Sequence, residues 1–179
     1  MPRHSFRALG FIAALIGPRQ LALAQDGPLP LRTEFLVELS AELEDSQMLG
    51  ETPLGGRRIV YVKGGNFAGP GLKGSVLPGG GDWVLVRKDG VSQLDVRITL
   101  RTEDGALIFV TYRGLLNMAP EMRTRIMNGE AVDPSGYYFR TTPSFETASE
   151  KYAWLNKLVT VGVGQRTRTG VSYSIYAIK

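Results

Sequence analysis

The sequence contains no cysteine, and the only histidine among its 179 residues is His4. Without cysteine the chain forms no disulfide bond and offers no thiolate to zinc. Beyond His4, the chain also lacks the groups for Ser-His-Asp catalysis, Cys-His catalysis and the usual histidine metal sites. We therefore expect no cofactor and no metal. Any acid–base chemistry has to use Asp, Glu, Tyr, Lys or Arg with shifted pKa values.

Long hydrophobic runs are also lacking, and the apolar stretch from Ala8 to Gly17 is too short to span a bilayer. It lies in "MPRHSFRALGFIAALIGPRQLALAQ", which has a basic start and small residues near its end, the pattern of a secretory signal peptide. A buried helix is the alternative, but Pro18 and Arg19 interrupt the run. We predict a signal peptide over residues 1–24 with cleavage after Ala24, and one domain over residues 25–179. The mature protein would be periplasmic or secreted, with no membrane partner.

The net charge is close to zero once the leader is set aside. The chain has 21 basic and 17 acidic residues, and removal of residues 1–24 leaves 18 basic and 17 acidic residues. A chain so close to neutral has no general electrostatic attraction to the phosphate backbone. We therefore expect no nucleic acid partner.

Short strand-like segments dominate the remaining sequence, and turn residues separate them. The Lys88-Asp89-Gly90 and Glu103-Asp104-Gly105 triplets are typical of hairpin connections, since glycine adopts the positive φ that such turns need. Strands at this spacing predict an all-β, antiparallel barrel. The predicted strands are 32–39, 57–62, 74–77, 82–87, 94–101, 106–113, 137–142, 154–164 and 170–178.

One helix is predicted, in "APEMRTRIMNG". Pro120 suits the first helical turn, and Gly129 can end the helix. Met118, Met122 and Ile126 recur four residues apart and would share a face. Such a helix either closes one end of the barrel or is a surface connector, and the pattern leaves both open.

The hairpin "LDVRITLRTEDGALIFVTYRG" places four polar residues on one strand face. With an even loop length, this face shares its side of the sheet with apolar and aromatic residues of the second strand, which predicts an amphiphilic cavity. The alternatives are a structural ion pair between Asp95 and Arg97, and a three-residue loop that reverses the pairing. The expected register sets Asp95, Arg97, Thr99 and Arg101 beside Gly114, Tyr112, Val110 and Ile108.

A second group of polar and aromatic residues lies in "YYFRTTPSFETASEKYAWLNK". Aromatic walls with a few directed polar groups are what a small-molecule pocket needs. The alternative is a hairpin whose aromatic residues pack in the core. With Trp83, the residues expected around a ligand are Arg101, Tyr138, Arg140, Tyr152, Trp154 and Asn156.

Three segments, "GETPLGGRRIVYVKGGNFAGPGLKGSVLPGGGDWVLVRKDG", the hairpin above and "YYFRTTPSFETASEKYAWLNKLVTVGVG", carry a resemblance. Together they resemble the uncharacterised bacterial family known as domain of unknown function 3237, or uncharacterised protein family 0311. The resemblance spans nearly all of the chain after the leader. It implies a calycin-like barrel similar to allene oxide cyclase, to which the sequence adds one short helix, and it implies no catalytic residues.

We therefore predict a barrel that binds a small hydrophobic or aromatic molecule, as a cofactor-free isomerase, cyclase or lyase. The expected base is Asp95 or Glu146, and Tyr112 is the expected acid. Arg97 and Arg140 would stabilise developing negative charge. A non-catalytic carrier and a structural scaffold are the alternatives. Apolar outer strand faces would suit either a homo-oligomer or a covering loop.

Overall fold

The computed structural model describes residues 27–179, and its barrel lies within the compact unit Leu31–Lys179. The predicted signal peptide and its cleavage site after Ala24 lie outside the described residues. Within residues 27–179, no helix has the length and apolar character to cross a membrane. The strands are β1 (Thr33–Leu43), β2 (Gln47–Thr52), β3 (Gly55–Gly69), β4 (Leu72–Val76), β5 (Gly81–Val86), β6 (Ser92–Thr102), β7 (Leu107–Asn117), β8 (Tyr138–Glu146), β9 (Thr160–Arg166) and β10 (Gly170–Ile178).

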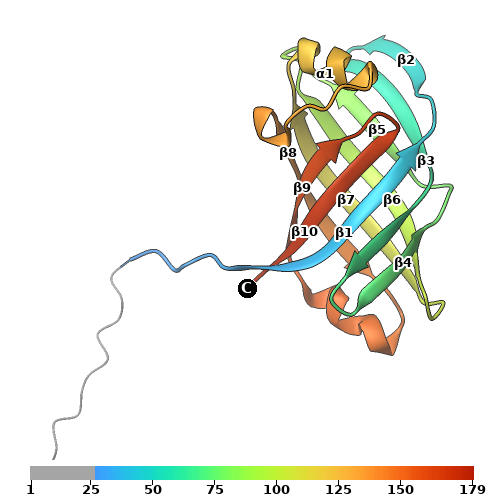
Figure 1. Cartoon of the computed structure of the whole chain (residues 1–179), viewed down its shortest axis with the longest axis vertical. Helices are drawn as coiled ribbons and strands as arrows, with labels where there is room; N and C mark the ends of the chain where they lie inside the picture. The colour runs from blue at the N-terminus through green and yellow to red at the C-terminus, as the bar shows by residue number, and fades with distance from the viewer. Residues whose placement is uncertain (1–26) are drawn as a thin grey trace, which may run out of the picture. The chain divides into compact units, whose positions relative to one another are not determined.

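These strands form one closed antiparallel sheet, as the barrel prediction requires (Figure 1). The order β1-β10-β9-β8-β7-β6 continues through β4 and β5 to β3, which pairs with β1 and closes the sheet. β4 and β5 each pair with both β3 and β6, so they share one position in the barrel wall. Likewise, β1 and β2 pair with successive parts of β3. The described strands therefore fill eight positions around the barrel.

Short helices lie at the two ends of the barrel (Figure 1). The helix α1 (Pro120–Met127) begins at its proline, and Gly129 follows it with a φ of 85°. Its Ile126 is buried in the hydrophobic core, so α1 closes an end of the barrel rather than serving as a surface connector. The 3-10 helix η2 (Glu150–Lys157) buries Tyr152 and Leu155 at the opposite end, and η1 (Pro134–Gly136) precedes β8.

Two strand predictions were wrong in detail. β2 was missed, because "QMLGET" shows no alternation of apolar and polar residues and most of its residues are exposed. The segment 154–164 was predicted as one strand, but η2 runs to Lys157 and β9 begins only at Thr160. Trp154 and Asn156 therefore lie on a helical turn and not on one face of a strand.

The register of the β6–β7 hairpin also differs from the prediction. Thr102 and Ala106 close a three-residue loop, so odd-numbered residues pair with odd-numbered residues, as in Asp95↔Arg113 and Arg97↔Thr111. Consequently, the polar face predicted to line a cavity lies on the outside of the barrel, with Asp95, Arg97, Thr99 and Arg101. The apolar residues of β6, together with those of β7, form the core: Leu94, Val96, Ile98, Leu100, Ile108, Val110 and Tyr112.

Candidate functional site

The barrel encloses a cavity of about 530 Å³, which we call the interior cavity. Its walls are mostly apolar, and α1 contributes Ile126 to them. The residues that face it come from alternate positions of the strands, because successive side chains of a strand point to opposite faces of the sheet. Its principal polar and ionisable residues are Arg58, Asp82, Ser92, Tyr112, Arg166 and Tyr173.

Asp82 is a partly buried carboxylate that lines the interior cavity. The pairing of β5 with β6 includes Asp82↔Val96 and resumes at Leu85↔Gln93. Between these pairs, the backbone N–H of Asp95 donates to Oδ1 of Asp82 at 3.0 Å. Burial raises the pKa of Asp82 to about 6, against the opposing effects of this hydrogen bond and the nearby Arg58. A carboxyl group with this pKa can both accept and donate a proton near neutral pH.

Two partly buried arginines, Arg58 on β3 and Arg166 on β9, share the interior cavity with Asp82. Burial lowers the pKa of both guanidinium groups, and their mutual repulsion with Arg123 of α1 lowers the pKa of Arg58 further. Both nevertheless stay protonated, because an arginine pKa lies far above neutral pH. In the part of the chain that the structure describes, neither arginine takes part in an ion pair. These cations therefore remain available to a ligand.

Two tyrosines, Tyr112 of β7 and Tyr173 of β10, lie together in the interior cavity. Their rings meet edge to face with centroids 5.4 Å apart. Burial raises the pKa of Tyr112 and of Tyr173 above the ordinary tyrosine value. Both hydroxyl groups therefore stay protonated at neutral pH, and this pair can donate a hydrogen bond to a bound molecule.

Other predicted site residues gather on the outside of the barrel, around a hollow of about 770 Å³ that we call the outer groove. The groove is lined by Trp83, Asp95, Tyr138 and Arg140, among others. At its edge, the Arg97 guanidinium lies 5.5 Å from the Trp83 ring centroid. The sequence thus identified residues that do lie together, but their expected place inside the barrel was wrong.

The predicted ion pair between Asp95 and Arg97 forms, with a distance of 3.1 Å from Oδ1 to Nη1. Its side chains are 39% and 49% exposed, so the pair is the structural alternative stated above rather than a buried catalytic pair. Glu146 and Arg101 are likewise exposed on the outer faces of β8 and β6. Among the four residues predicted to be catalytic, only Tyr112 faces the interior cavity.

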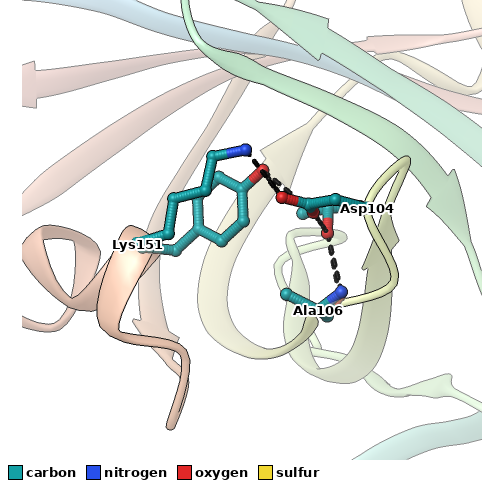
Figure 2. A network of polar contacts seen from close by, with 5 residues as sticks. Asp104, Ala106 and Lys151 are labelled. Carbon is teal, nitrogen blue, oxygen red and sulfur yellow. Dashed lines mark hydrogen bonds and ion pairs between the residues drawn. The ribbon is translucent and has the colours of Figure 1, made fainter.

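Tyr152 and its neighbours belong to a polar network at the end of the barrel opposite α1. Its hydroxyl donates to both carboxylate oxygens of Asp104, at 3.1 and 3.2 Å. Figure 2 shows Lys151 reaching from η2 to Asp104, and the Nζ–Oδ2 distance is 2.6 Å. Hydrogen bonds from Lys151 and Thr102 hold the pKa of Asp104 well below its usual range. The network therefore fastens η2 to the β6–β7 turn.

Asn156 and Trp154 do not contribute to either hollow. Asn156 accepts from the backbone N–H of Thr147 and donates to its carbonyl, both at 2.9 Å. These bonds hold the connection between β8 and η2, while Trp154 is 41% exposed. The ligand-binding prediction for these two residues and Tyr152 was based on a strand, and the helical turn gives Asn156 and Tyr152 structural partners instead.

Sequence reasoning missed Arg58, Asp82, Arg166 and Tyr173. A usable signal was present in β5, where Asp82 and Val84 alternate with Trp83 and Leu85. An acidic residue in phase with an inward valine indicates a buried carboxylate. Arg58 is similarly in phase with Val60 of β3. In residues 27–179, no cluster of three or more acidic or histidine side chains could hold a metal ion.

Comparison with known proteins identifies the family. The model of DUF3237, a family described as proteins of unknown function, matches residues 31–178. The chain belongs to the DUF3237 family. The resemblance and the barrel expected from the sequence are thus confirmed.

Relatives of this DUF3237 protein are similar along most of their length. A UPF0311 protein of Rhodopseudomonas palustris is 33% identical over 83% of this chain and 97% of its own. The crystal structure of a conserved protein of unknown function from that species has a TM-score of 0.80, with 32% identity over 85% of this chain and all of that one. A β-barrel-like protein from Acinetobacter baumannii has a TM-score of 0.75, with 39% identity over 87% of this chain and all of that one.

A more distant relative carries the name of an activity. A protein of Penicillium herquei named as a hydroalkoxylation enzyme is 26% identical over 136 residues, which is 75% of each chain. This chain thus has a distant relative that is named as an enzyme.

Proposed function

We propose that this protein binds a small hydrophobic or aromatic molecule in the interior cavity and catalyses a cofactor-free isomerisation, cyclisation or elimination. The observation that carries the proposal is Asp82, a partly buried carboxyl group that lines a mostly apolar cavity and has a pKa of about 6. Buried ionisable groups with pKa values near neutrality are typical of catalytic acids and bases. The cavity also counts against the scaffold alternative, since a scaffold needs no hollow interior.

The residues suggest a division of roles. Asp82 replaces Asp95 and Glu146 as the base, because those two lie on the outer face. The tyrosine pair Tyr112–Tyr173 provides the hydrogen-bond donor to an oxygen that gains negative charge. Arg58 stabilises the same charge, as preorganised cations do in a site that excludes water.

Hydroalkoxylation, the activity in the fungal relative's name, fits this set of groups. The reaction adds the O–H of an alcohol or phenol across a C=C bond, so that one C–O and one C–H bond form. Nothing is oxidised or reduced. In the intramolecular form, which closes a ring, Asp82 would remove the proton from oxygen and return it to carbon.

The test uses 2′-hydroxychalcone, a coloured phenol that closes to colourless flavanone by this addition. We expect the purified protein to accelerate the loss of colour and Asp82→Asn to abolish the acceleration. Binding of hydroxychalcone without acceleration would favour the carrier alternative over an enzyme for this substrate class. Full acceleration by Asp82→Asn would overturn the role of Asp82.

The predicted export of the chain is a separate proposal. We expect the protein recovered from its own host to begin near Gln25, in the periplasm or the medium. Intact-mass measurement of that protein tests this, and a cytoplasmic chain that retains residues 1–24 would contradict it.

A further inference from the structure

We propose that the interior cavity selects an aromatic anion, namely an arene that carries a carboxylate or an ionised phenol. This inference rests on the proposed function, because it names the class of molecule that the same cavity takes. It comes from the balance of buried charge and not from any relative.

Positive charge exceeds negative charge inside the barrel. Burial raises the pKa of the single carboxyl group of Asp82. Three cations, Arg58, Arg123 and Arg166, repel one another in the same region. Near the opening, exposed residues of both signs also line the cavity: Glu44, Asp45, Lys63 and Arg168. The inner part of the cavity therefore has a net positive charge when it is empty.

The protein itself leaves part of this polar lining without partners. Nε of Arg58 is buried and has no hydrogen-bond partner in the described structure. The hydroxyl group of Ser92, a residue only 1% exposed, is unpartnered as well. A buried polar group without a partner costs free energy, and a guanidinium costs more than a neutral group. A carboxylate or phenolate in the cavity would pair with the guanidinium groups of Arg58 and Arg166, which line it, since guanidinium groups match the planar oxygens of a carboxylate.

The rest of the cavity suits an aromatic ring. Phe139, Tyr112 and Tyr173 form a continuous aromatic wall, with Phe139 and Tyr173 edge to face at 5.3 Å between ring centroids. Such edges pack well against another ring. The cavity volume of about 530 Å³ leaves room for a molecule of one to three rings.

Calorimetry with 2-naphthoate and its neutral analogue 2-naphthamide tests the charge preference. We expect the protein to bind 2-naphthoate at least about tenfold more tightly than 2-naphthamide at about pH 7. Arg58→Met and Arg166→Met should each remove most of that preference, because methionine keeps length and apolar volume but loses the charge. Arg57→Met is the matched control, since Arg57 points to the outer groove, and it should leave both affinities unchanged.

Equal binding of the two probes would overturn the inference, and so would absence of binding by both. A loss in Arg57→Met equal to that in Arg58→Met would also overturn it, because the effect would then be one of overall charge. Circular dichroism and thermal unfolding show whether each variant is folded. If Arg58→Met does not fold, Asp82→Asn supplies the test: removal of the negative charge of Asp82 should tighten 2-naphthoate binding and leave 2-naphthamide binding unchanged.

4-Nitrophenol distinguishes the two sources of negative charge. Its ionised form is yellow, and we expect the bound molecule to be yellow at a pH where the free molecule is mostly colourless. Bound but colourless nitrophenol would exclude the phenolate and leave the carboxylate. Turnover of hydroxychalcone is measured separately: a preference for naphthoate without turnover refutes only catalysis, and turnover without a charge preference refutes only the present inference.

Discussion

The interior cavity and the outer groove are built from the same kinds of residue, and often from neighbours in the chain. Arg57 faces the groove and Arg58 faces the cavity, while Asp82 faces the cavity and Trp83 the groove. Each hollow therefore has arginine, aromatic rings and a carboxylate. Only their surroundings differ.

In the outer groove the charged side chains are exposed to water or have polar partners. Asp95 pairs with Arg97, and Nη1 of Arg57 donates to the carbonyl of Trp83 at 2.9 Å. In the interior cavity, burial removes water from Asp82 and Arg58 without supplying an ion pair. The comparison shows that residue types alone do not make a reactive site. Desolvation changes the pKa of Asp82 to a value that acid–base chemistry near neutral pH can use.

The largest effect should come from removing the buried carboxylate. Asp82→Asn is expected to slow hydroxychalcone cyclisation by at least about 100-fold, the usual contribution of a general acid–base group. Asp95→Asn makes the same chemical change in the outer groove and should alter the rate by less than about twofold, as expected of a surface site. Absorbance decay at saturating substrate gives both rates. Equal losses in the two variants would remove the distinction between the hollows.

The same substitution should stabilise the fold at high pH. The pKa of Asp82 in the folded protein, about 6, lies above its ordinary value of 3.8, so the stability it contributes is complete below pH 3.8 and is lost as the pH rises through 6. Asparagine does not ionise. Asp82→Asn should therefore exceed the wild type in unfolding free energy by about 3 kcal/mol at about pH 8 and equal it near pH 4. Urea unfolding at both pH values measures this, and a variant that is less stable at pH 8 would contradict the buried, ionised state.

Loss of one tyrosine hydroxyl should have a smaller effect. Tyr112→Phe is expected to lower the cyclisation rate by about tenfold, because Tyr173 still donates a hydrogen bond to the substrate. Tyr138→Phe changes the outer groove in the same way and should leave the rate unchanged. Steady-state kinetics should assign the loss in Tyr112→Phe to kcat rather than KM. A loss confined to KM would mean that Tyr112 only fills space.

The smallest effect is expected at the rim of the outer groove. Arg97→Ala removes the ion pair with Asp95 and the stacking on Trp83, and should lower the unfolding free energy by about 1 kcal/mol or less. The unfolding midpoint in urea measures this effect. Binding of 2-naphthoate should not change in Arg97→Ala, and a clear loss of binding would show that the outer groove communicates with the cavity.

Much of the fold could be predicted from the sequence, because strand alternation and turn glycines are local properties. Gly105 adopts a φ of 89° in the β6–β7 turn, and the helix begins at Pro120, both as predicted. The residues of the candidate site were harder to predict. The predicted β6–β7 loop differed from the observed loop by one residue in length. The prediction therefore placed the outward-facing side chains of β6 inside the barrel and the inward-facing ones outside. Tyr112 was placed correctly, although the register that led to it was wrong.

By itself, the sequence determined an antiparallel barrel, the absence of histidine and cysteine from any site after His4, and the family. Those conclusions depend on composition, on local pattern and on similarity along the chain. The tertiary structure alone decided that Arg58, Asp82, Arg166 and Tyr173 meet in one cavity, because they come from four strands that closure of the barrel brings together. The tertiary structure also decided which carboxylate is shielded from water. Burial depends on every strand around a residue, whereas alternation along one strand shows only that two faces exist.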